Sequence, residues 1–139
     1  MTLALHLRVV GVLLMVLGLS HMFFNRLFGW ERELAGVSLF TRKVFYVHTF
    51  FIGLSVAMAG AASLVYARAL LAPGALSRAI LAGMAVFWLC RMLAQWFVYD
   101  AAIWRGNRFR TWMHVMFSAL WIYVTATYGS ALVSVWLRS

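Results

Sequence analysis

Four long apolar stretches dominate the sequence, and short polar breaks separate them. A helix needs about 20 mostly apolar residues to cross the roughly 30 Å hydrocarbon core of a bilayer, and each stretch meets that length. Within lipid, a helix satisfies all of its own backbone hydrogen bonds. The pattern therefore predicts an all-α integral membrane protein with spans at residues 9–28, 44–66, 80–102 and 111–132.

The breaks between these stretches restrict the topology. The first contains GWERELAG, the second holds the only Pro-Gly pair at Pro73 and Gly74, and the third reads RGNRFR. Helices joined by such short connections are antiparallel neighbours. We expect an up-down four-helix bundle in which residues 1–139 form a single transmembrane domain, because the spans and their flanks use nearly the whole chain.

The composition supports a membrane location and excludes several other classes of protein. Apolar residues make up 65% of the chain and charged residues 11%, whereas soluble domains have roughly 45–50% and 25%. A water-soluble globule is therefore excluded. The single cysteine, Cys90, lies inside an apolar run, which rules out a disulfide framework or a paired-thiol redox or zinc motif within the chain.

The charge is strongly basic, with 12 Lys and Arg against 3 Asp and Glu and a net charge of +9. All of the basic residues except Arg91 fall at the ends of the predicted helices, where basic side chains anchor to lipid headgroups. No basic helix face or soluble module is present to bind nucleic acid. The bilayer itself is the partner that this charge predicts.

The distribution of basic residues also predicts an orientation. The side that holds the two connections from 29 to 43 and from 103 to 110 carries more Lys and Arg than the side that holds the termini. Cytoplasmic loops carry the excess of positive charge in membrane proteins. We therefore expect a multi-pass protein of a bacterial-type inner membrane with both termini on the periplasmic, outer side.

Arg91 is the exception among the basic residues, because it falls in the middle of the third span. An arginine there costs roughly 2.5–3.5 kcal/mol on insertion scales, so it must find polar partners. Gln95 and Tyr99 follow at four and eight residues, which places the three side chains along one drifting face of a helix. This face predicts a polar site inside the bundle.

The other three helices carry their own polar faces at a similar depth. His21 and Asn25 lie near the end of the first span, His48 lies near the start of the second, and His114 lies near the start of the fourth. All of these positions belong to the half of the membrane next to the more basic side. In lipid, polar faces turn toward the bundle interior, so we expect these residues to share a site with Arg91.

A displacement of 66 residues aligns RKVFYVHTFFIGL with RFRTWMHVMFSAL and places His48 on His114. If the second and fourth helices are copies, the chain consists of two parallel helix-hairpin repeats about an axis along the membrane normal. The two histidines would then face each other at one depth across the bundle. An alternative is chance similarity between apolar spans.

These patterns favour a membrane-embedded redox protein or a subunit of a redox complex. His48 and His114, with His21 as a third ligand, would hold a transition metal ion such as Fe, Cu or Zn, or a haem b. The diagonal placement resembles, in architecture alone, the helix pair that holds haem in b-type cytochromes. The polar part of a quinone-like or other lipid-soluble substrate would bind at Arg91, Gln95, Tyr99 and Asn25.

Two alternatives belong to other functional classes. A structural or assembly subunit of a membrane complex would use the same polar groups only for hydrogen bonds between helices. A small transporter of protons or anions would use the histidines and Arg91 as a relay. In each case the chain could form a homo-oligomer or join other membrane subunits, with Gly60 and Gly83 as close-packing surfaces.

Overall fold

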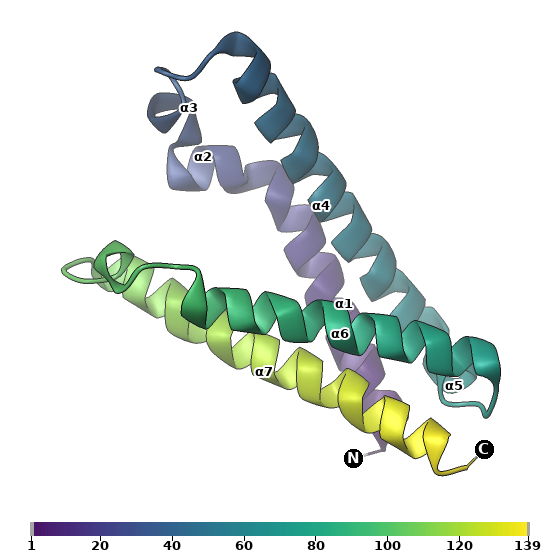
Figure 1. Ribbon diagram of the computed structural model, residues 1–139. Coiled ribbons are helices and arrows are strands. Elements are labelled where there is room, and N and C mark those ends of the chain that lie inside the picture. Colours follow the sequence, from purple (N-terminus) through teal and green to yellow (C-terminus); the bar gives the residue numbers. More distant parts are fainter. Residues whose placement is uncertain (1, 139) are drawn as a thin grey trace. The chain divides into compact units, whose positions relative to one another are not determined.

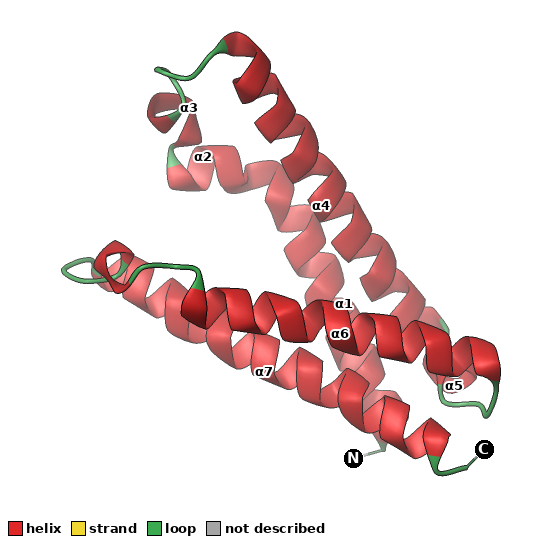
Figure 2. Ribbon diagram, viewed as in Figure 1, coloured by secondary structure: helices red, strands yellow, loops and turns green. Residues whose placement is uncertain are grey.

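A computed structural model describes residues 2–138 of the chain, with residue 101 described as backbone only. The chain is all-helical, with 85% of its residues in helices and no strand in the described part (Figure 1, Figure 2). In chain order the elements are α1 (Leu3–Ser20), the 3-10 turn η1 (His21–Phe23), α2 (Phe24–Phe28), α3 (Trp30–Glu33), α4 (Leu39–Val65), α5 (Ala67–Leu70), α6 (Ala75–Phe97), the 3-10 turn η2 (Ala101–Ile103) and α7 (Arg108–Trp136).

Four helical segments in the described residues are long and apolar enough to cross a membrane. The first combines α1, η1 and α2 over Leu3–Phe28, and the others are α4, α6 and α7. Each contains most of one stretch expected from the sequence. The third helix ends earlier than expected, at Phe97 rather than at residue 102, and the chain forms the short turn η2 before α7 begins.

Glycines and polar caps explain where several helices begin and end. Gly29 adopts a left-handed conformation with φ of 66° and separates α2 from α3, as glycine commonly does at a helix C-terminus. The side chain of Ser38 accepts a hydrogen bond from the backbone N–H of Thr41 at the start of α4. Asn107 does the same for Arg110 at the start of α7. These are standard N-caps, which satisfy otherwise unpaired N–H groups.

The chain divides into two compact units. Unit 2 is Arg8–Ala67, which contains most of α1, η1, α2, α3 and α4. Unit 1 combines the start of the chain, as far as Leu7, with the segment that begins at Arg68 and contains the rest of α5 together with α6, η2 and α7.

In unit 2, glycines allow α1 and α4 to approach closely. A Cβ built on Gly18 would lie 2.5 Å from the backbone nitrogen of Ala57, and one on Gly60 would lie 2.7 Å from the carbonyl oxygen of Gly11. On each helix the two contact glycines are seven residues apart, Gly11 and Gly18 on α1 and Gly53 and Gly60 on α4. Small residues of this kind are typical where membrane helices pack with their backbones in close approach.

In unit 1, α6 and α7 lie side by side along their lengths (Figure 1). The buried residues of α6 are Leu81, Trp88 and Gln95, spaced seven residues apart. Those of α7 follow alternating steps of three and four residues: Trp121, Val124, Tyr128, Ala131 and Val135, with Thr127 beside them. Such spacings are typical of helices that pack at shallow angles with coiled-coil-like interdigitation. Among these buried residues of α6 and α7, Gln95 has the only strongly polar side chain. Its position is therefore the position of the polar site.

Candidate functional site

The polar site of unit 1 is centred on the side-chain amide of Gln95, which is only 3% exposed. Arg91, one turn earlier on α6, donates a hydrogen bond from Nη1 to Oε1 of Gln95 over 3.2 Å. The indole Nε1 of Trp121, on α7, donates to the same oxygen over 3.4 Å. A buried amide costs free energy unless it is hydrogen-bonded, and these contacts meet that requirement for the oxygen.

The two donors also fix the orientation of the amide and the tautomer of His114. Arg91 and Trp121 can only donate, so the amide oxygen of Gln95 must face them. The amide nitrogen then faces Nδ1 of His114 at 2.9 Å, and Nδ1 must accept. A neutral His114 therefore carries its proton on Nε2, and Nε2 is a hydrogen-bond donor.

Aromatic rings surround the Arg91 guanidinium and the His114 imidazole. The guanidinium carbon of Arg91 lies 4.8 Å from the ring centre of Trp121 and 5.8 Å from that of Tyr99, distances at which a cation is attracted to the ring face. Trp104 lies over the ring of His114, with centroids 4.4 Å apart. The site thus combines one cation and one imidazole with flat aromatic surfaces.

Arg91 has no carboxylate partner among the described residues of unit 1. Asp100 is the only acidic residue in the segment that begins at Arg68, and its Oδ1 accepts a hydrogen bond from the backbone N–H of Ala102. The guanidinium has five N–H donors, and Gln95 accepts from one of its nitrogens. A half-buried cation with unused donors can therefore bind an anion or a carbonyl oxygen.

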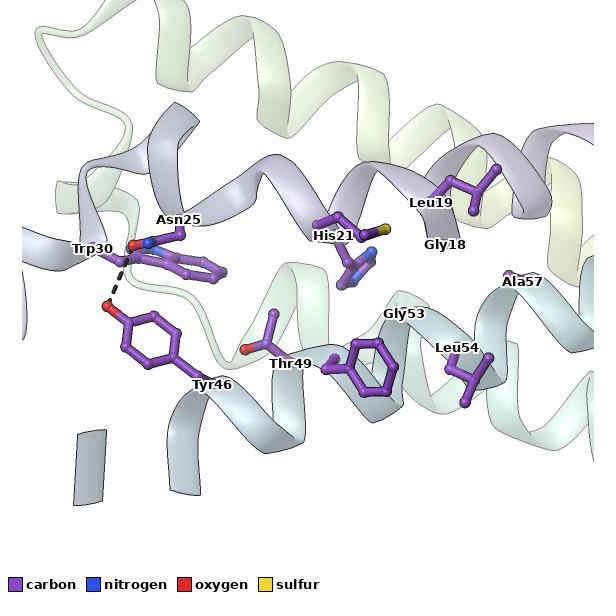
Figure 3. A pocket seen from close by; sticks show the side chains of 12 residues that line it. Gly18, Leu19, His21, Asn25, Trp30, Tyr46, Thr49, Gly53, Leu54 and Ala57 are labelled. Atoms are coloured by element: carbon purple, nitrogen blue, oxygen red, sulfur yellow. Dashed lines mark hydrogen bonds between the residues drawn. The ribbon is translucent and has the colours of Figure 1, made fainter. Parts of the chain in front are cut away.

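The second candidate site is a pocket of about 390 Å³ in unit 2, between the first helical segment and α4 (Figure 3). Ligand-binding pockets commonly have volumes of roughly 300–1,000 Å³. None of the residues that line this pocket carries a formal charge. They are Gly18, Leu19, His21, Met22, Asn25, Trp30, Tyr46, Thr49, Phe50, Gly53, Leu54 and Ala57.

A local change in hydrogen bonding accompanies the opening of the pocket. The carbonyl oxygen of Leu17 accepts bonds from Oγ of Ser20 over 2.7 Å and from Nδ1 of His21 over 2.8 Å. Side chains that bond to nearby carbonyls compete with the helical backbone ladder and bend the helix. The helix changes to the 3-10 turn η1 at His21, directly after the close contact between Gly18 and Ala57.

The polar groups of the pocket lie in its middle and at one end (Figure 3). The ring of His21 lies between the helices near Gly53, whereas Asn25, Trp30 and Tyr46 gather at the end away from Gly18 (Figure 3). The hydroxyl of Tyr46 donates to Oδ1 of Asn25 over 3.3 Å. Nδ1 of His21 must donate to the Leu17 carbonyl, since that oxygen can only accept, so a neutral His21 has an unprotonated Nε2.

The residues expected to share one site are placed in both units. Arg91, Gln95, Tyr99 and His114 come together in unit 1, and His21 and Asn25 line the pocket of unit 2. His48 is exposed and is not among the residues that line the pocket.

The expected metal ligands belong to different units, with His114 in unit 1 and His21 and His48 in unit 2. Within either unit, no three described His, Cys, Asp or Glu side chains gather as a metal ion requires. Ligation by His21, His48 and His114 together therefore stays a prediction.

Several residues of these sites were not singled out from the sequence. Trp121 lies seven residues after His114 and so on the same helix face, a signal that could have identified it. Tyr46 and Trp104 give no such signal, because their contacts depend on tertiary structure. His6 of α1, also passed over, forms a hydrogen bond through Nδ1 with the hydroxyl of Tyr123 over 2.9 Å.

No family model matches the sequence, and no curated protein or solved structure is significantly similar to it.

Proposed function

We propose that the chain is an integral membrane protein that binds the polar head of a quinone-like, lipid-soluble molecule at Arg91 and His114, as a redox protein or a subunit of a redox complex. The observation that carries the proposal is the Arg91 guanidinium, which has unused donors and no carboxylate partner in the described part of unit 1. A cation placed in the apolar part of a membrane is costly unless it is paired. A bound carbonyl or anionic oxygen would supply the missing partner.

The neighbouring groups favour a carbonyl on a flat ring. Nε2–H of His114 is a second donor, so Arg91 and His114 each offer an N–H group to an acceptor. Trp104 and Tyr99 provide aromatic surfaces beside these donors, and aromatic rings pack well against one another in offset or edge-to-face arrangements. A quinone head combines a flat ring with carbonyl oxygens that can accept hydrogen bonds from a guanidinium and an imidazole.

The proposed membrane topology is an up-down bundle with both termini on the outer side of a bacterial-type inner membrane. Its support is the excess of Lys and Arg in the two connections on the opposite side. The arrangement as two parallel hairpin repeats, with His48 and His114 as equivalent positions, belongs to the same proposal. A reporter fused after the last residue should report an outer location, and a cytoplasmic signal would reverse this orientation.

A second candidate is the transition metal or haem b held by histidines. The observation in its favour is that Nδ1 of His21 donates to Leu17, and Nδ1 of His48 donates to the carbonyl of Val44 over 2.8 Å. Metal-binding histidines typically donate one ring N–H to a carbonyl and bind the metal with the other nitrogen. His114 would have to exchange its tautomer to join them, since Gln95 donates to its Nδ1. An optical spectrum and metal analysis of the purified protein would detect either cofactor.

Quinone binding tests the main proposal. Decyl-benzoquinone should bind to the protein in mild detergent, measured by calorimetry, and Arg91→Leu should weaken binding at least about tenfold, because charge-assisted hydrogen bonds contribute roughly 1.5–3 kcal/mol. Arg68→Leu is the matched control, since Arg68 is exposed in the same unit. Equal binding by wild-type protein and Arg91→Leu would refute the proposal. Absence of binding to the wild type, together with a loss of stability in Arg91→Leu, would favour the purely structural alternative.

A further inference from the structure

The pocket of unit 2 differs from the Arg91 site in the chemistry that it presents. No Asp, Glu, Lys or Arg is among the residues that line it, so a charged ligand would lack an ionic partner there. A desolvated, unpaired charge is strongly unfavourable. The occupant that suits these walls is neutral.

The polar atoms of the pocket specify where that neutral ligand needs hydrogen-bonding groups. Nε2 of His21 is an acceptor, because Nδ1 donates to the Leu17 carbonyl. Oδ1 of Asn25 already accepts from Tyr46, and the amide nitrogen of Asn25 retains two N–H donors. A complementary ligand therefore carries a hydroxyl that donates to His21 and an oxygen that accepts from Asn25.

The remaining walls indicate a ring rather than a chain at this position. Trp30 and Phe50 contribute flat aromatic surfaces. Gly18 and Gly53 hold the two helices in close contact at one end of the pocket (Figure 3). Leu19, Met22 and Phe50 are all more than half exposed. These apolar side chains would face an aliphatic tail that leaves the pocket.

From these contacts we infer that the pocket between η1 and α4 binds a neutral aromatic molecule with a ring hydroxyl, a phenol or a hydroquinone, whose hydroxyl donates to Nε2 of His21. The site shares no residue with the Arg91 network and does not depend on it. The ligand of the Arg91 network needs only acceptor oxygens, whereas the ligand of this pocket needs a donor. A hydroquinone meets that requirement and its oxidised quinone does not.

The test uses the full chain in mild detergent and decyl-hydroquinone as the probe, with its dimethyl ether as a ligand of nearly the same shape that cannot donate. Calorimetry should show that the wild type binds decyl-hydroquinone at least about tenfold more tightly than the ether, the effect of one well-made hydrogen bond. His21→Phe should lower the affinity for decyl-hydroquinone by a similar factor. His6→Phe is the matched control, because it also removes an imidazole, but from unit 1 and at a position that does not line the pocket, and it should leave the affinity unchanged.

A spectroscopic readout covers the case in which His21→Phe does not fold. In wild-type protein labelled with ¹⁵N at histidine, the Nε2 resonance of His21 should shift on addition of decyl-hydroquinone, and that of His48 should not. Asn25→Leu offers a second variant with the same expected loss of affinity. Nonylphenol carries one ring hydroxyl and distinguishes the two ligand classes. If the wild type binds nonylphenol as tightly as decyl-hydroquinone, the preferred ligand is a simple phenol. If it binds nonylphenol more weakly, the preferred ligand is a hydroquinone.

Three results would overturn the inference. They are equal affinity of the wild type for decyl-hydroquinone and its dimethyl ether, unchanged affinity in His21→Phe, and no binding of decyl-hydroquinone by the wild type. If Arg91→Leu abolished hydroquinone binding while His21→Phe preserved it, the ligand would belong to unit 1. That result would refute this inference and leave the proposal for Arg91 standing.

Discussion

Gly18 of α1 and Gly53 of α4 face each other so closely that a Cβ built on Gly18 would lie 2.6 Å from the carbonyl oxygen of Gly53. Real Cβ atoms do not approach other heavy atoms this closely. The contact lies at the edge of the unit 2 pocket, which both glycines line. The separation of the helices at this point therefore determines both the stability of unit 2 and the shape of its pocket.

Gly18→Ala should destabilise unit 2, although alanine is the better helix former by about 1 kcal/mol. The added methyl group would have to move backbone atoms of α4, and overpacking of this kind costs about 1–3 kcal/mol. Thermal unfolding in detergent should show a lower midpoint for this variant. Gly83→Ala and Gly129→Ala are matched controls, since a Cβ at either glycine meets nothing within 4 Å. An unchanged midpoint for Gly18→Ala would contradict the close contact.

Gln95→Leu should destabilise unit 1 by about 1–3 kcal/mol, the usual cost of leaving buried polar partners unsatisfied. The substitution removes the acceptor of Arg91 and Trp121 and the donor to His114. Thermal unfolding measures the loss. Trp96→Phe serves as control, because it removes a bond of similar type, to Ser118, at an exposed position. Similar midpoints for the two variants would argue against a central role for Gln95.

The hydrogen bonds predict different tautomers for the histidines when their rings are neutral. His114 should carry its proton on Nε2, because Gln95 donates to Nδ1. His21 and His48 should carry theirs on Nδ1, since each faces a carbonyl oxygen. Solid-state NMR of protein labelled with ¹⁵N at histidine distinguishes the two forms. Detection of the Nδ1–H form for His114 would mean that the Gln95 amide is turned around.

Tyr123→Phe should loosen the first turns of α1, because it removes the hydrogen bond between Tyr123 and His6. A net loss of about 1 kcal/mol is typical for one such bond. Hydrogen exchange at the start of α1 should become faster, and a double-mutant cycle with His6→Phe should reveal coupling between the two residues. Tyr66→Phe is the control, since Tyr66 is exposed. Independent effects of the two substitutions would exclude the bond.

Hydropathy predicted the four long helices well, because the apolar length that a span requires is a property of the sequence alone. It misplaced the end of α6, since Val98 and Tyr99 are apolar enough to continue the stretch although the helix ends at Phe97. It also offered Gly60 as a surface between copies of the chain. In the structure Gly60 lies against Gly11 of the same chain, whereas Gly83 is open.

The helical spacing of Arg91 and Gln95 predicts one shared face, and the depth along the helices predicts that His114 lies nearby. In the structure, hydrogen bonds join Gln95 to both Arg91 and His114. The pocket of unit 2 could not be predicted in this way. It depends on the side-chain hydrogen bonds to the Leu17 carbonyl and on a tertiary contact between Asn25 and Tyr46. Neither hydropathy nor periodicity contains that information.

The carbonyl of Leu17 has a consequence for how the chain tolerates change. The main-chain oxygen of Leu17 accepts the hydrogen bonds that accompany η1 and that fix the tautomer of His21. Every amino acid supplies that oxygen. Position 17 is therefore free to vary among residues that preserve the helix and its packing, while the ligand preference proposed for the pocket depends on the side chain at position 21. A single substitution at position 21 would therefore change what the pocket selects, without any change to the glycines at which the two helices pack together.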